Sequence, residues 1–461
     1  MALIYNTLTG QKENLEQALG GKKDIRLFVC GPTVYDYIQI GNARTYSVFD
    51  IITRYLRASG YKVKYLQNIT DIDDKIIRRA TERGVKPAML AKEYEKAYHE
   101  DEKKLNIVSV NKYARATKYI KEIVRQISAL VEKGHAYRTD DGYYFDISTF
   151  SDYGKLAKRT AAQAEDSVSR IDESVSKRNK GDFALWKFSK EGEPAWRTAL
   201  GEGRPGWHIE DTAITEYHFG PQYDLHGGGV DLIFPHHEAE IAQQESASGR
   251  KPMVQIWIHS GFLNISGKKM SKSGEFITVR DFLKNNSAAV FRYLVAAHHY
   301  RSPINYSDEL VSQIKNALDG LSQFLAKLKT VSGNIDVDES AASEKFTAAM
   351  DDDFNTPEAL AAIFGLVNEL NPKIWDVSKK SAKKLEKWLK SALEIFGVKL
   401  QLPKIPYKIA RLADKRELFR SNKQFIQSDD LRKEVERLGY TIEDTPAGPF
   451  LWPNSNSHLK T

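Results

Sequence analysis

The segment GKKMSKSGEF, residues 267–276, gathers side chains that could act on a phosphate group. Three lysines and three serines fall within residues 266–273, next to Gly267 and Gly274. Lysine ammonium groups on a glycine-bounded loop suit a triphosphate, whose charge must be neutralised as it reacts. A surface loop that is merely basic would have the same composition, so the segment alone does not decide between the two interpretations.

A second segment that could hold a phosphate is YDYIQIGNART, residues 35–45, which follows an apolar run. Gly41 would let the backbone approach a ligand at the start of a helix, where the helix N-terminus favours anionic groups. Any turn between a strand and a helix can look like this, so the segment is a weak indication by itself. Its pairing with the lysine-rich segment much later in the chain carries far more weight than either segment alone.

The elements that must position these residues alternate between strand and helix in the first half of the chain. Residues 24–31 predict a buried strand, residues 42–60 predict an amphipathic helix that ends at a glycine, and residues 61–70 predict a second strand. This order is typical of a parallel, doubly wound sheet. Residues 71–133 read as helical and charged, and from about residue 307 onward the pattern is helical again.

The bulk composition fits a multidomain globular protein of the cytoplasm. Of 461 residues, 41% are hydrophobic and 28% are charged, and Cys30 is the single cysteine. One cysteine allows no internal disulfide, which fits a reducing compartment. No apolar stretch reaches the roughly 18–20 residues of a membrane span, and the first residues lack the pattern of a signal peptide. We therefore expect a cytoplasmic location and no contact with a membrane.

The positive charge of the chain is concentrated near its C-terminal end. The formal net charge is +7, and residues 373–440 alone hold 18 Lys and Arg against 9 Asp and Glu. A solvated helical surface would account for such a run. A polyanion partner such as nucleic acid would account for it as well.

Seven motifs occur in order along the chain: FVCGPTVYD with IGNART, NITDIDDKI, DFALWK, GRPGWHIE, DLHGGGVDLIFPHHEAEIAQ, KKMSKS and MDDDFNTPEAL. Together they closely resemble those of the cysteinyl-tRNA synthetases, a family of the class I aminoacyl-tRNA synthetases. Several are peculiar to that family rather than shared by the class. The resemblance runs from about residue 5 to about residue 450.

The resemblance implies an α/β fold in which a Rossmann-type parallel-sheet catalytic core carries an inserted subdomain, followed by a helical bundle and a small C-terminal anticodon-binding domain. Six segments are expected: the first half of the core, the inserted connective subdomain, the second half of the core, the KMSKS subdomain, the tRNA-binding helical bundle and the anticodon-binding domain. In that order they span residues 1–133, 134–206, 207–265, 266–306, 307–400 and 401–461.

The activity that the resemblance implies is that of a cysteine–tRNA ligase. Such an enzyme activates L-cysteine with ATP to cysteinyl-adenylate and transfers the cysteinyl group to the 3′ end of tRNA(Cys). Magnesium would accompany ATP, and the protein would act as a monomer. Three alternatives stay open: a paralogue that passes the cysteinyl group to a small amine, a catalytically retired synthetase that only binds RNA, and an enzyme with a changed amino-acid specificity.

In the family a zinc ion at the floor of the amino-acid pocket binds the thiolate of the substrate. Its ligands are two cysteines, a histidine and a glutamate, and Cys30, His236 and Glu240 match three of them. His236 and Glu240 lie four residues apart after Pro235, on one face of an expected helix, so both can reach one ion. Asp211 stands where the family usually has the second cysteine. A carboxylate is an acceptable but harder ligand, so we expect one zinc ion on these four residues, with a weaker metal site, or no metal site, as the alternative.

The remaining site residues are also implied by the resemblance. Gln39 stands where the family has the first histidine of the HIGH element, and Asn42 is a common variant at its last position. A glutamine amide can donate a hydrogen bond but carries no positive charge, so Lys269 and Lys272 would supply the charge that stabilises the reacting phosphate. The expected ligand contacts are Gly41, Gly228, Asp231 and Lys272 for ATP, and Thr70, Trp207 and His237 for the amino acid.

In this family the helical bundle and the C-terminal domain hold the tRNA, which favours the nucleic-acid interpretation of the basic stretch. Phosphate contacts would come from Lys and Arg, and anticodon bases can stack on aromatic rings or Arg planes. The candidates for tRNA contact are Arg432, Lys433, Arg437 and Trp452.

Overall fold

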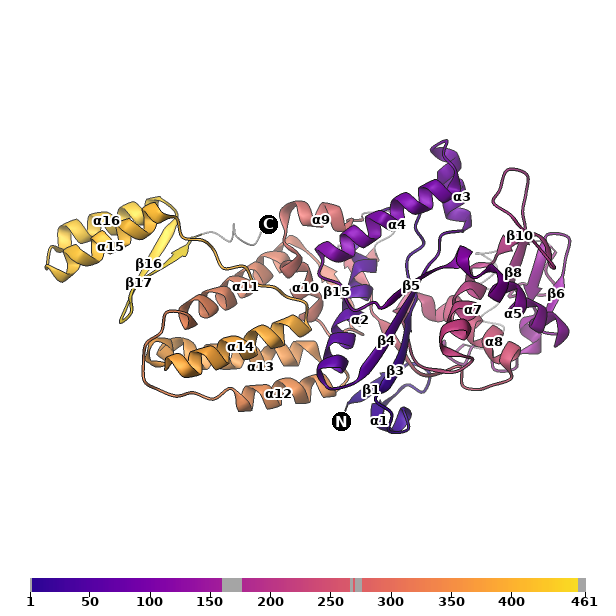
Figure 1. Cartoon of the computed structure of the whole chain (residues 1–461), viewed down its shortest axis with the longest axis horizontal. Helices are drawn as coiled ribbons and strands as arrows, with labels where there is room; N and C mark the ends of the chain where they lie inside the picture. Colours follow the sequence, from indigo (N-terminus) through magenta and orange to yellow (C-terminus); the bar gives the residue numbers. More distant parts are fainter. Residues whose placement is uncertain (1, 160–175, 266–267, 270–275, 455–461) are drawn as a thin grey trace.

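A five-stranded parallel sheet forms the centre of the first half of the chain (Figure 1). The computed structural model describes residues 2–159, 176–265, 268–269 and 276–454. Every neighbouring pair of strands in this sheet is parallel. In spatial order the strands are β12 (Val254–Ser260), β11 (Tyr223–Gly229), β3 (Asp24–Val29), β4 (Lys62–Ile69) and β5 (Lys112–Arg115). The predicted Rossmann-type core is confirmed.

The central strands are apolar on both faces because helices cover both sides of the sheet. Successive side chains of a strand point to opposite faces. Leu27 of β3 therefore packs into one core cluster with α2 (Ile40–Ala58), whereas its neighbour Phe28 packs into another with α5 (Ile120–Glu132) and α7 (Trp207–Phe219). The three predicted elements of residues 24–70 are all present as β3, α2 and β4.

The turn from α2 into β4 and the edge strand β5 show what the pattern could and could not predict. Gly60 has a φ of +88°, a left-handed conformation that glycine adopts without strain, and the helix ends there as expected.

The prediction that residues 71–133 are helical throughout is wrong at β5. This strand has only four residues, too few for an alternating pattern to appear in the sequence. Around it lie α3 (Asp74–Glu82), α4 (Pro87–Lys104) and the short η1 (Ala116–Lys118).

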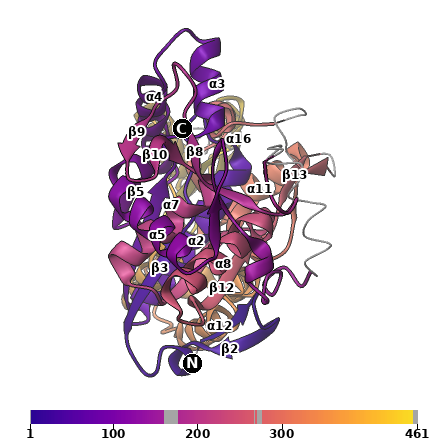
Figure 2. The same cartoon turned by 90° about the vertical axis from the view of Figure 1, so that its right-hand side faces the viewer.

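A second, antiparallel sheet is inserted between α5 and α7 (Figure 2). Its strands, in spatial order, are β6 (Ala136–Arg138), β7 (Gly142–Phe145), β8 (Phe183–Phe188), β10 (Gly201–Pro205) and β9 (Trp196–Thr198). The hairpin of β6 and β7 is followed by η2 (Ile147–Thr149). Helices α5, α7 and α8 (Glu238–Ser248) pack together beside this sheet.

After β12 the chain leaves the parallel sheet for a small three-stranded one. Its strands are β14 (Lys268–Lys269), β13 (Leu263–Ile265) and β15 (Ile304–Tyr306), accompanied by α9 (Val279–Asn285) and α10 (Ala288–Ala296). The N-terminal residues form the hairpin of β1 (Leu3–Asn6) and β2 (Gln11–Asn14), followed by α1 (Leu15–Ala18). None of the helices in the described residues is long and apolar enough to cross a membrane.

The predicted helical bundle packs against α2 and α10. It consists of α11 (Asp308–Leu328), α12 (Ser340–Asp351), α13 (Thr356–Leu370), η5 (Asn371–Asp376) and α14 (Lys379–Ile395). A buried ion pair ties it to the core: Asp50 of α2 lies 2.7 Å from Arg292 of α10 and 2.7 Å from Arg54, and Arg54 also pairs with Glu394 of α14. Asp50 and Arg54 of α2 therefore link the core to α10 and to α14 of the bundle.

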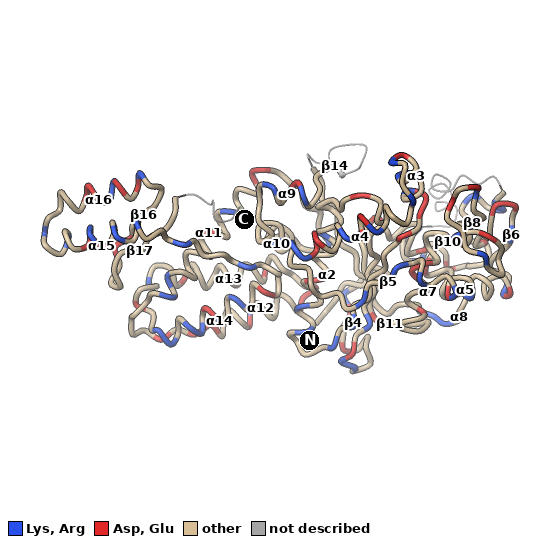
Figure 3. The backbone as a smooth tube through the Cα atoms, turned by 45° about the horizontal axis from the view of Figure 1, so that its top comes forward, with Lys and Arg blue, Asp and Glu red and all other residues tan. Residues whose placement is uncertain are grey.

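The last unit of the chain lies at the far end of the molecule from the inserted sheet (Figure 1). It contains α15 (Tyr407–Ser421), α16 (Phe425–Arg437) and the hairpin of β16 (Tyr440–Thr445) and β17 (Gly448–Pro453), and we call it the C-terminal unit. Figure 3 shows Lys and Arg along α14, α15 and α16, with Asp and Glu between them. The positive excess is thus spread over a mixed surface.

Candidate active site

A cavity of about 370 Å³ opens beyond the carboxyl ends of β3 and β11, the edge where ligands bind in open α/β sheets. Six of the residues predicted for the site line it: Cys30, Gln39, Gly41, Asn42, Trp207 and Asp231. The chain therefore brings the start of α2, the end of β11 and the single cysteine to one place, although they are far apart in the sequence.

The first turn of α2 forms one wall of this cavity. Gln39 precedes the helix with extended backbone, φ −83° and ψ 156°, and its side chain makes no capping hydrogen bond to the helix. Its amide is therefore not used in capping the start of the helix. Gly41 and Asn42 follow in the first turn and line the cavity as well.

The residues that directly follow the lysine-rich segment are hydrogen-bonded to the same wall. The N–H of Ile40 donates to the carbonyl of Ile277 over 2.9 Å, and the N–H of Val279 donates to the carbonyl of Ile38 over 3.0 Å. Lys272 lies outside the described residues. Lys269 is described only as the last residue of β14, without its side chain.

Behind the cavity lies the four-residue cluster predicted to bind metal, which we call the metal cluster: Cys30, Asp211, His236 and Glu240. One ligand atom from each lies within 4.8 Å of the others, and all four residues are buried. Nε2 of His236 is 3.0 Å from Oδ2 of Asp211 and 3.1 Å from Oε1 of Glu240. The structure thus brings the four predicted side chains to one point.

Four different elements supply these side chains. Cys30 directly follows β3, and Asp211 lies on α7. His236 lies in the irregular turn η4 (Ile233–His237), which follows η3 (Val230–Leu232), and Glu240 lies in the first turn of α8. The predicted one-face spacing of His236 and Glu240 places both at one point, although the element around His236 is a wide turn rather than a regular helix.

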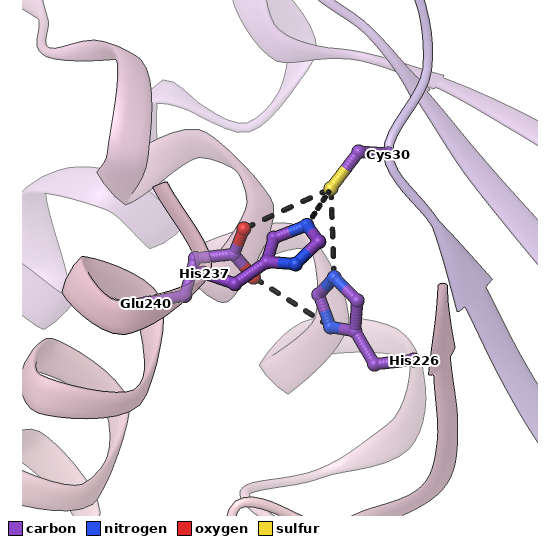
Figure 4. A group of neighbouring side chains, drawn as sticks. All are labelled: Cys30, His226, His237 and Glu240. Atoms are coloured by element: carbon purple, nitrogen blue, oxygen red, sulfur yellow. Dashed lines mark hydrogen bonds and ion pairs between the residues drawn. The ribbon is translucent and has the colours of Figure 1, made fainter. Parts of the chain in front are cut away.

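Two further histidines share this location, and only one of them was expected near it. Figure 4 shows His226 and His237 with Cys30 and Glu240, a second combination whose ligand atoms also lie within 4.8 Å of one another. Sγ of Cys30 is 3.1 Å from Nε2 of His237 and 3.5 Å from Nε2 of His226. Because both combinations contain Cys30 and Glu240, they describe one site. His226 was missed because the stretch that contains it had been assigned to ATP through Gly228 and Asp231.

The electrostatics of the cluster fit a bound cation. Burial raises the pKa of the Cys30 thiol, and the nearby Glu240 and Asp211 raise it further. Burial also raises the pKa of Glu240, with Asp211 adding to the effect, and it lowers the pKa of His226 and His237. Oδ1 of Asp211 and Oε2 of Glu240 are buried without a hydrogen-bond partner. Buried carboxylates need a partner of opposite charge, so these donors suit a divalent metal ion.

Trp207 and Thr70, both predicted to contact the amino acid, take different positions. The Trp207 ring stacks on His236 with centroids 4.1 Å apart and an angle of 21°, and it lines the cavity. Thr70 is buried outside the cavity wall, where its hydroxyl donates to Oε2 of Glu210 over 2.9 Å. Burial raises the pKa of Glu210, and Asp211 raises it further. Thr70 therefore supports the helix that carries Asp211 rather than facing the cavity.

The glycines at the end of β11 have a packing explanation. A Cβ on Gly228 would lie 2.8 Å from Cε1 of His237, and a Cβ on Gly227 would lie 2.2 Å from Cε1 of Phe49. Gly228 is not among the residues that line the cavity, whereas Gly229 and Asp231 are. The prediction that Gly228 approaches ATP is not supported, because its missing side chain makes room for the His237 ring.

The residues of the C-terminal unit that were predicted to contact tRNA differ in how exposed they are. Arg432 is partly exposed and pairs with Asp444 over 3.1 Å, and Arg437 bonds to the carbonyl of Lys433 on the exposed face of α16. Trp452 is only 5% exposed, and its indole N–H donates to Asp319 of α11 over 3.0 Å. Trp452 thus attaches the unit to the bundle, and the expectation that a base stacks on it is wrong.

Exposed aromatic rings of the C-terminal unit lie elsewhere. Tyr407 is 77% exposed and Phe425 is 60% exposed, each at the first turn of a helix. A large apolar residue at the start of a polar helix was the signal in the sequence that could have identified Phe425.

Two family models match the chain. One, described as the class I (C) catalytic domain of the tRNA synthetases, covers residues 16–316, and the other, a DALR domain, covers residues 345–401. Curated relatives resemble the chain over almost its full length. A cysteine–tRNA ligase of Thermoplasma volcanium is 44% identical over 96% of this chain and 98% of its own length. Those of Thermococcus gammatolerans and Coxiella burnetii are 43% and 42% identical, each over 96% of this chain and 98% of their own length.

Solved structures of other class I enzymes share the fold at low sequence identity. The methionyl-tRNA synthetase of Mycobacterium tuberculosis, solved with methionyl-adenylate, has a TM-score of 0.58 at 18% identity over 81% of this chain and 89% of its own. A leucyl-tRNA synthetase of Agrobacterium radiobacter K84, in a ternary complex with tRNA, has a TM-score of 0.62 at 12% identity over 81% of this chain and 84% of its own.

Proposed function

This chain belongs to the cysteine–tRNA ligase family of the class I aminoacyl-tRNA synthetases, and from that premise we propose how its residues perform the reaction. The carboxylate of L-cysteine attacks the α-phosphate of ATP, and pyrophosphate leaves. A hydroxyl of the terminal ribose of tRNA(Cys) then attacks the carbonyl of the cysteinyl-adenylate, and AMP leaves. The observation that carries the proposal is the metal cluster directly behind the cavity that the start of α2 lines.

The first step depends on positioning and on charge stabilisation. The backbone of Gly41 and Asn42 at the start of α2 receives the phosphates of ATP, and the Gln39 amide donates a hydrogen bond to the reacting phosphate. Lys269 and Lys272 supply the positive charge that a glutamine lacks. Magnesium accompanies ATP, and Asp231 holds the ribose.

Besides ATP, the site holds a zinc ion, which is bound by Cys30, Asp211, His236 and Glu240. One sulfur, one nitrogen and two oxygen donors make a set that zinc accepts. When bound there, zinc supplies a Lewis-acidic contact for the thiolate of cysteine. Trp207 lies flat on His236, so it fixes the ring of that ligand and walls the space for the substrate side chain.

The helical bundle and the C-terminal unit hold the tRNA. Arg432, Lys433 and Arg437 contact its phosphates, and Phe425 takes the stacking role first assigned to Trp452. We further propose a cytoplasmic monomer with the domain boundaries given above, at residues 133, 206, 265, 306 and 400.

ATP–pyrophosphate exchange with each of the twenty amino acids, with and without added zinc, tests this function. Exchange with cysteine alone, dependent on zinc, supports the proposal. Exchange with a different amino acid would mean that Asp211 has redirected the pocket. Absence of exchange with all twenty would overturn the proposed activation step.

A further inference from the structure

The chain is attached to α2 on both sides of the lysine-rich segment. After the segment, the attachment is the pair of main-chain hydrogen bonds between residues 38–40 and 277–279. Before it, two side chains near the start of α2 make the contacts: Arg44 reaches the residues around β13, and the Thr45 hydroxyl lies 2.8 Å from that of Ser260. We propose that Arg44 is a positioning residue of the activation step. The inference rests on the proposed function and deepens it, because it adds a residue that acts through another.

The guanidinium of Arg44 holds three main-chain carbonyls from two segments. Nη1 donates to the carbonyl of Phe262 over 2.5 Å, and Nη2 donates to the carbonyls of Tyr300, over 3.2 Å, and Ser302. Phe262 lines the cavity and directly precedes β13, whereas residues 300–302 lie just before β15. Because β13 and β15 are paired in parallel, one side chain of α2 holds both strands where they begin.

The position of Lys269 depends on this attachment. Strand β14 pairs with β13, and the register places Lys269 opposite Asn264. The main chain of Lys269 is therefore located by β13, and Arg44 locates β13 relative to Gly41 and the rest of the cavity wall at the start of α2. A lysine that stabilises charge on a reacting phosphate must be held at the right distance, because a shift of about 1 Å can lower a rate by about a hundredfold.

Arginine is a costly residue at this place in the core. Arg44 is 1% exposed, and its Nε is buried without a hydrogen-bond partner. Burial lowers its pKa to about 10, and within the described residues no carboxylate offsets that effect. An apolar side chain would fill the same space without the desolvation cost. The three carbonyl contacts are what the arginine provides in return.

The two strands keep each other in place without Arg44. The N–H of Ile304 also donates to the carbonyl of Phe262, over 2.8 Å, and the N–H of Gly261 also donates to the carbonyl of Tyr300, over 2.8 Å. Removing the guanidinium therefore leaves the pairing of β13 and β15 intact. The contribution of Arg44 is the set of hydrogen bonds that joins this pair of strands to α2, so its loss should change position more than stability.

The test is a double-mutant cycle of Arg44→Met and Lys269→Ala, read as the rate of adenylate formation in a single turnover, which can be measured in slow variants. We expect Arg44→Met to lower this rate about tenfold, with the cysteine concentration for half-maximal rate unchanged, because the proposed site for cysteine is at Trp207 and the metal cluster. In the Lys269→Ala background the same change should alter the rate by less than about twofold, because two residues that act as one unit are not additive.

The matched control is Arg57→Met. Arg57 lies at the other end of α2, its Nη2 also donates to main-chain carbonyls, those of Val63 and Ser109, and it does not line the cavity. This variant removes a similar set of hydrogen bonds from the same helix and should form adenylate at the wild-type rate.

Arg44→Lys completes the design. A lysine keeps the charge but lacks the fork that reaches several acceptors, so this variant should stay impaired, and it carries the same cycle if Arg44→Met does not fold. Full recovery in Arg44→Lys, a wild-type rate in Arg44→Met, or an equal loss with and without Lys269 would each overturn the inference. Absence of adenylate formation in the wild type would instead overturn the proposed function.

Discussion

The metal cluster and the C-terminal unit arrange their charges in opposite ways. None of the four residues of the metal cluster is more than 5% exposed, and the carboxylates of Asp211 and Glu240 both lie next to His236. In the C-terminal unit one carboxylate, Asp444, lies among Arg416, Arg420 and Arg432, and the last two of these are exposed by about 40%. Buried groups without water depend on one another, whereas exposed pairs keep their hydration and contribute little each.

The difference teaches where single residues matter. A buried site concentrates its function in few groups, because each removal leaves another charge without a partner. A charged surface distributes its function, so that one substitution changes the affinity by a small factor. Four predictions test this contrast, in order of decreasing effect.

The largest effect is expected for His236→Ala. Nε2 of His236 lies within 3.1 Å of both carboxylates, so its loss leaves two negative groups facing each other without a shared donor or metal. We expect zinc in the dialysed protein, measured by elemental analysis, to fall from near one equivalent to background, and exchange to fall with it.

Two further variants sharpen this result. His218→Ala is the control, because His218 lies at the end of α7 and contacts Tyr119 rather than the cluster. Asp211→Cys should keep one equivalent of zinc and bind it more tightly, because a thiolate is the softer ligand. Zinc retained in full by the His236 variant would contradict the assignment of the cluster.

The second prediction concerns the buried joint at Asp50. Asp50→Asn leaves Arg292 without its counter-charge at zero exposure, so we expect the free energy of unfolding in urea to fall by about 3–5 kcal/mol. Glu82→Gln, which breaks an exposed pair with Arg79, is the control and should change it by less than about 0.5 kcal/mol.

The same pair gives stability a pH dependence. Burial acts to raise the pKa of Asp50, but Arg292 and Arg54 outweigh it, so that the pKa lies below its ordinary 3.8. A pKa that is lower in the folded state stabilises the protein at any pH above the ordinary pKa of the carboxyl group. This contribution is lost as the pH falls through the pKa of the folded state. The difference in stability between wild type and Asp50→Asn should therefore shrink below pH 3.8. If the difference in unfolding free energy stayed constant below pH 3.8, the pKa of Asp50 would not differ between the folded and unfolded states.

The third prediction separates the exposed aromatic ring from the buried one. Phe425→Ala should weaken tRNA(Cys) binding by about 1–3 kcal/mol, the contribution of one stacked base, without changing the melting temperature. Trp452→Ala should instead lower the melting temperature, because this ring is buried and bonded to Asp319. Equal tRNA affinities of wild type and Phe425→Ala would remove Phe425 from the interface.

The smallest effect is expected at His99, which lies between the two extremes of burial. Hydrogen bonds to Glu102 and Glu95 raise its pKa from 6.5 to about 9. A raised pKa stabilises the folded state fully below pH 6.5, and this contribution is lost as the pH rises through 9. Because His99 is partly exposed, the loss should be less than about 1 kcal/mol. The unfolding free energy of His99→Gln, compared with the wild type at pH 6 and pH 9.5, measures it.

The sequence predicts the buried half of this molecule well, because burial leaves a pattern. The apolar runs of β3 and β4, the helix of α2, and the spacing of His236 and Glu240 all follow from alternation and period. Strand β5 escapes prediction because four residues carry too little pattern. The sequence could not show that Gly228 lies outside the cavity wall, because the ring that fills the space beside it comes from His237, on another element. Trp452 was misjudged because an aromatic side chain near a basic helix looks the same in the sequence whether it is exposed or packed.

The hydrogen bonds at the start of α2 have a consequence for Gln39. The N–H of Ile40 is occupied by the carbonyl of Ile277, and the N–H of Ala43 by the carbonyl of Gln39. Within the described residues, the two N–H groups between them, those of Gly41 and Asn42, have no acceptor. They form a pair of adjacent donors on the cavity wall that belongs to the main chain and survives any exchange of side chains. The side chain at position 39 can therefore change without removing these two backbone donors from the cavity wall.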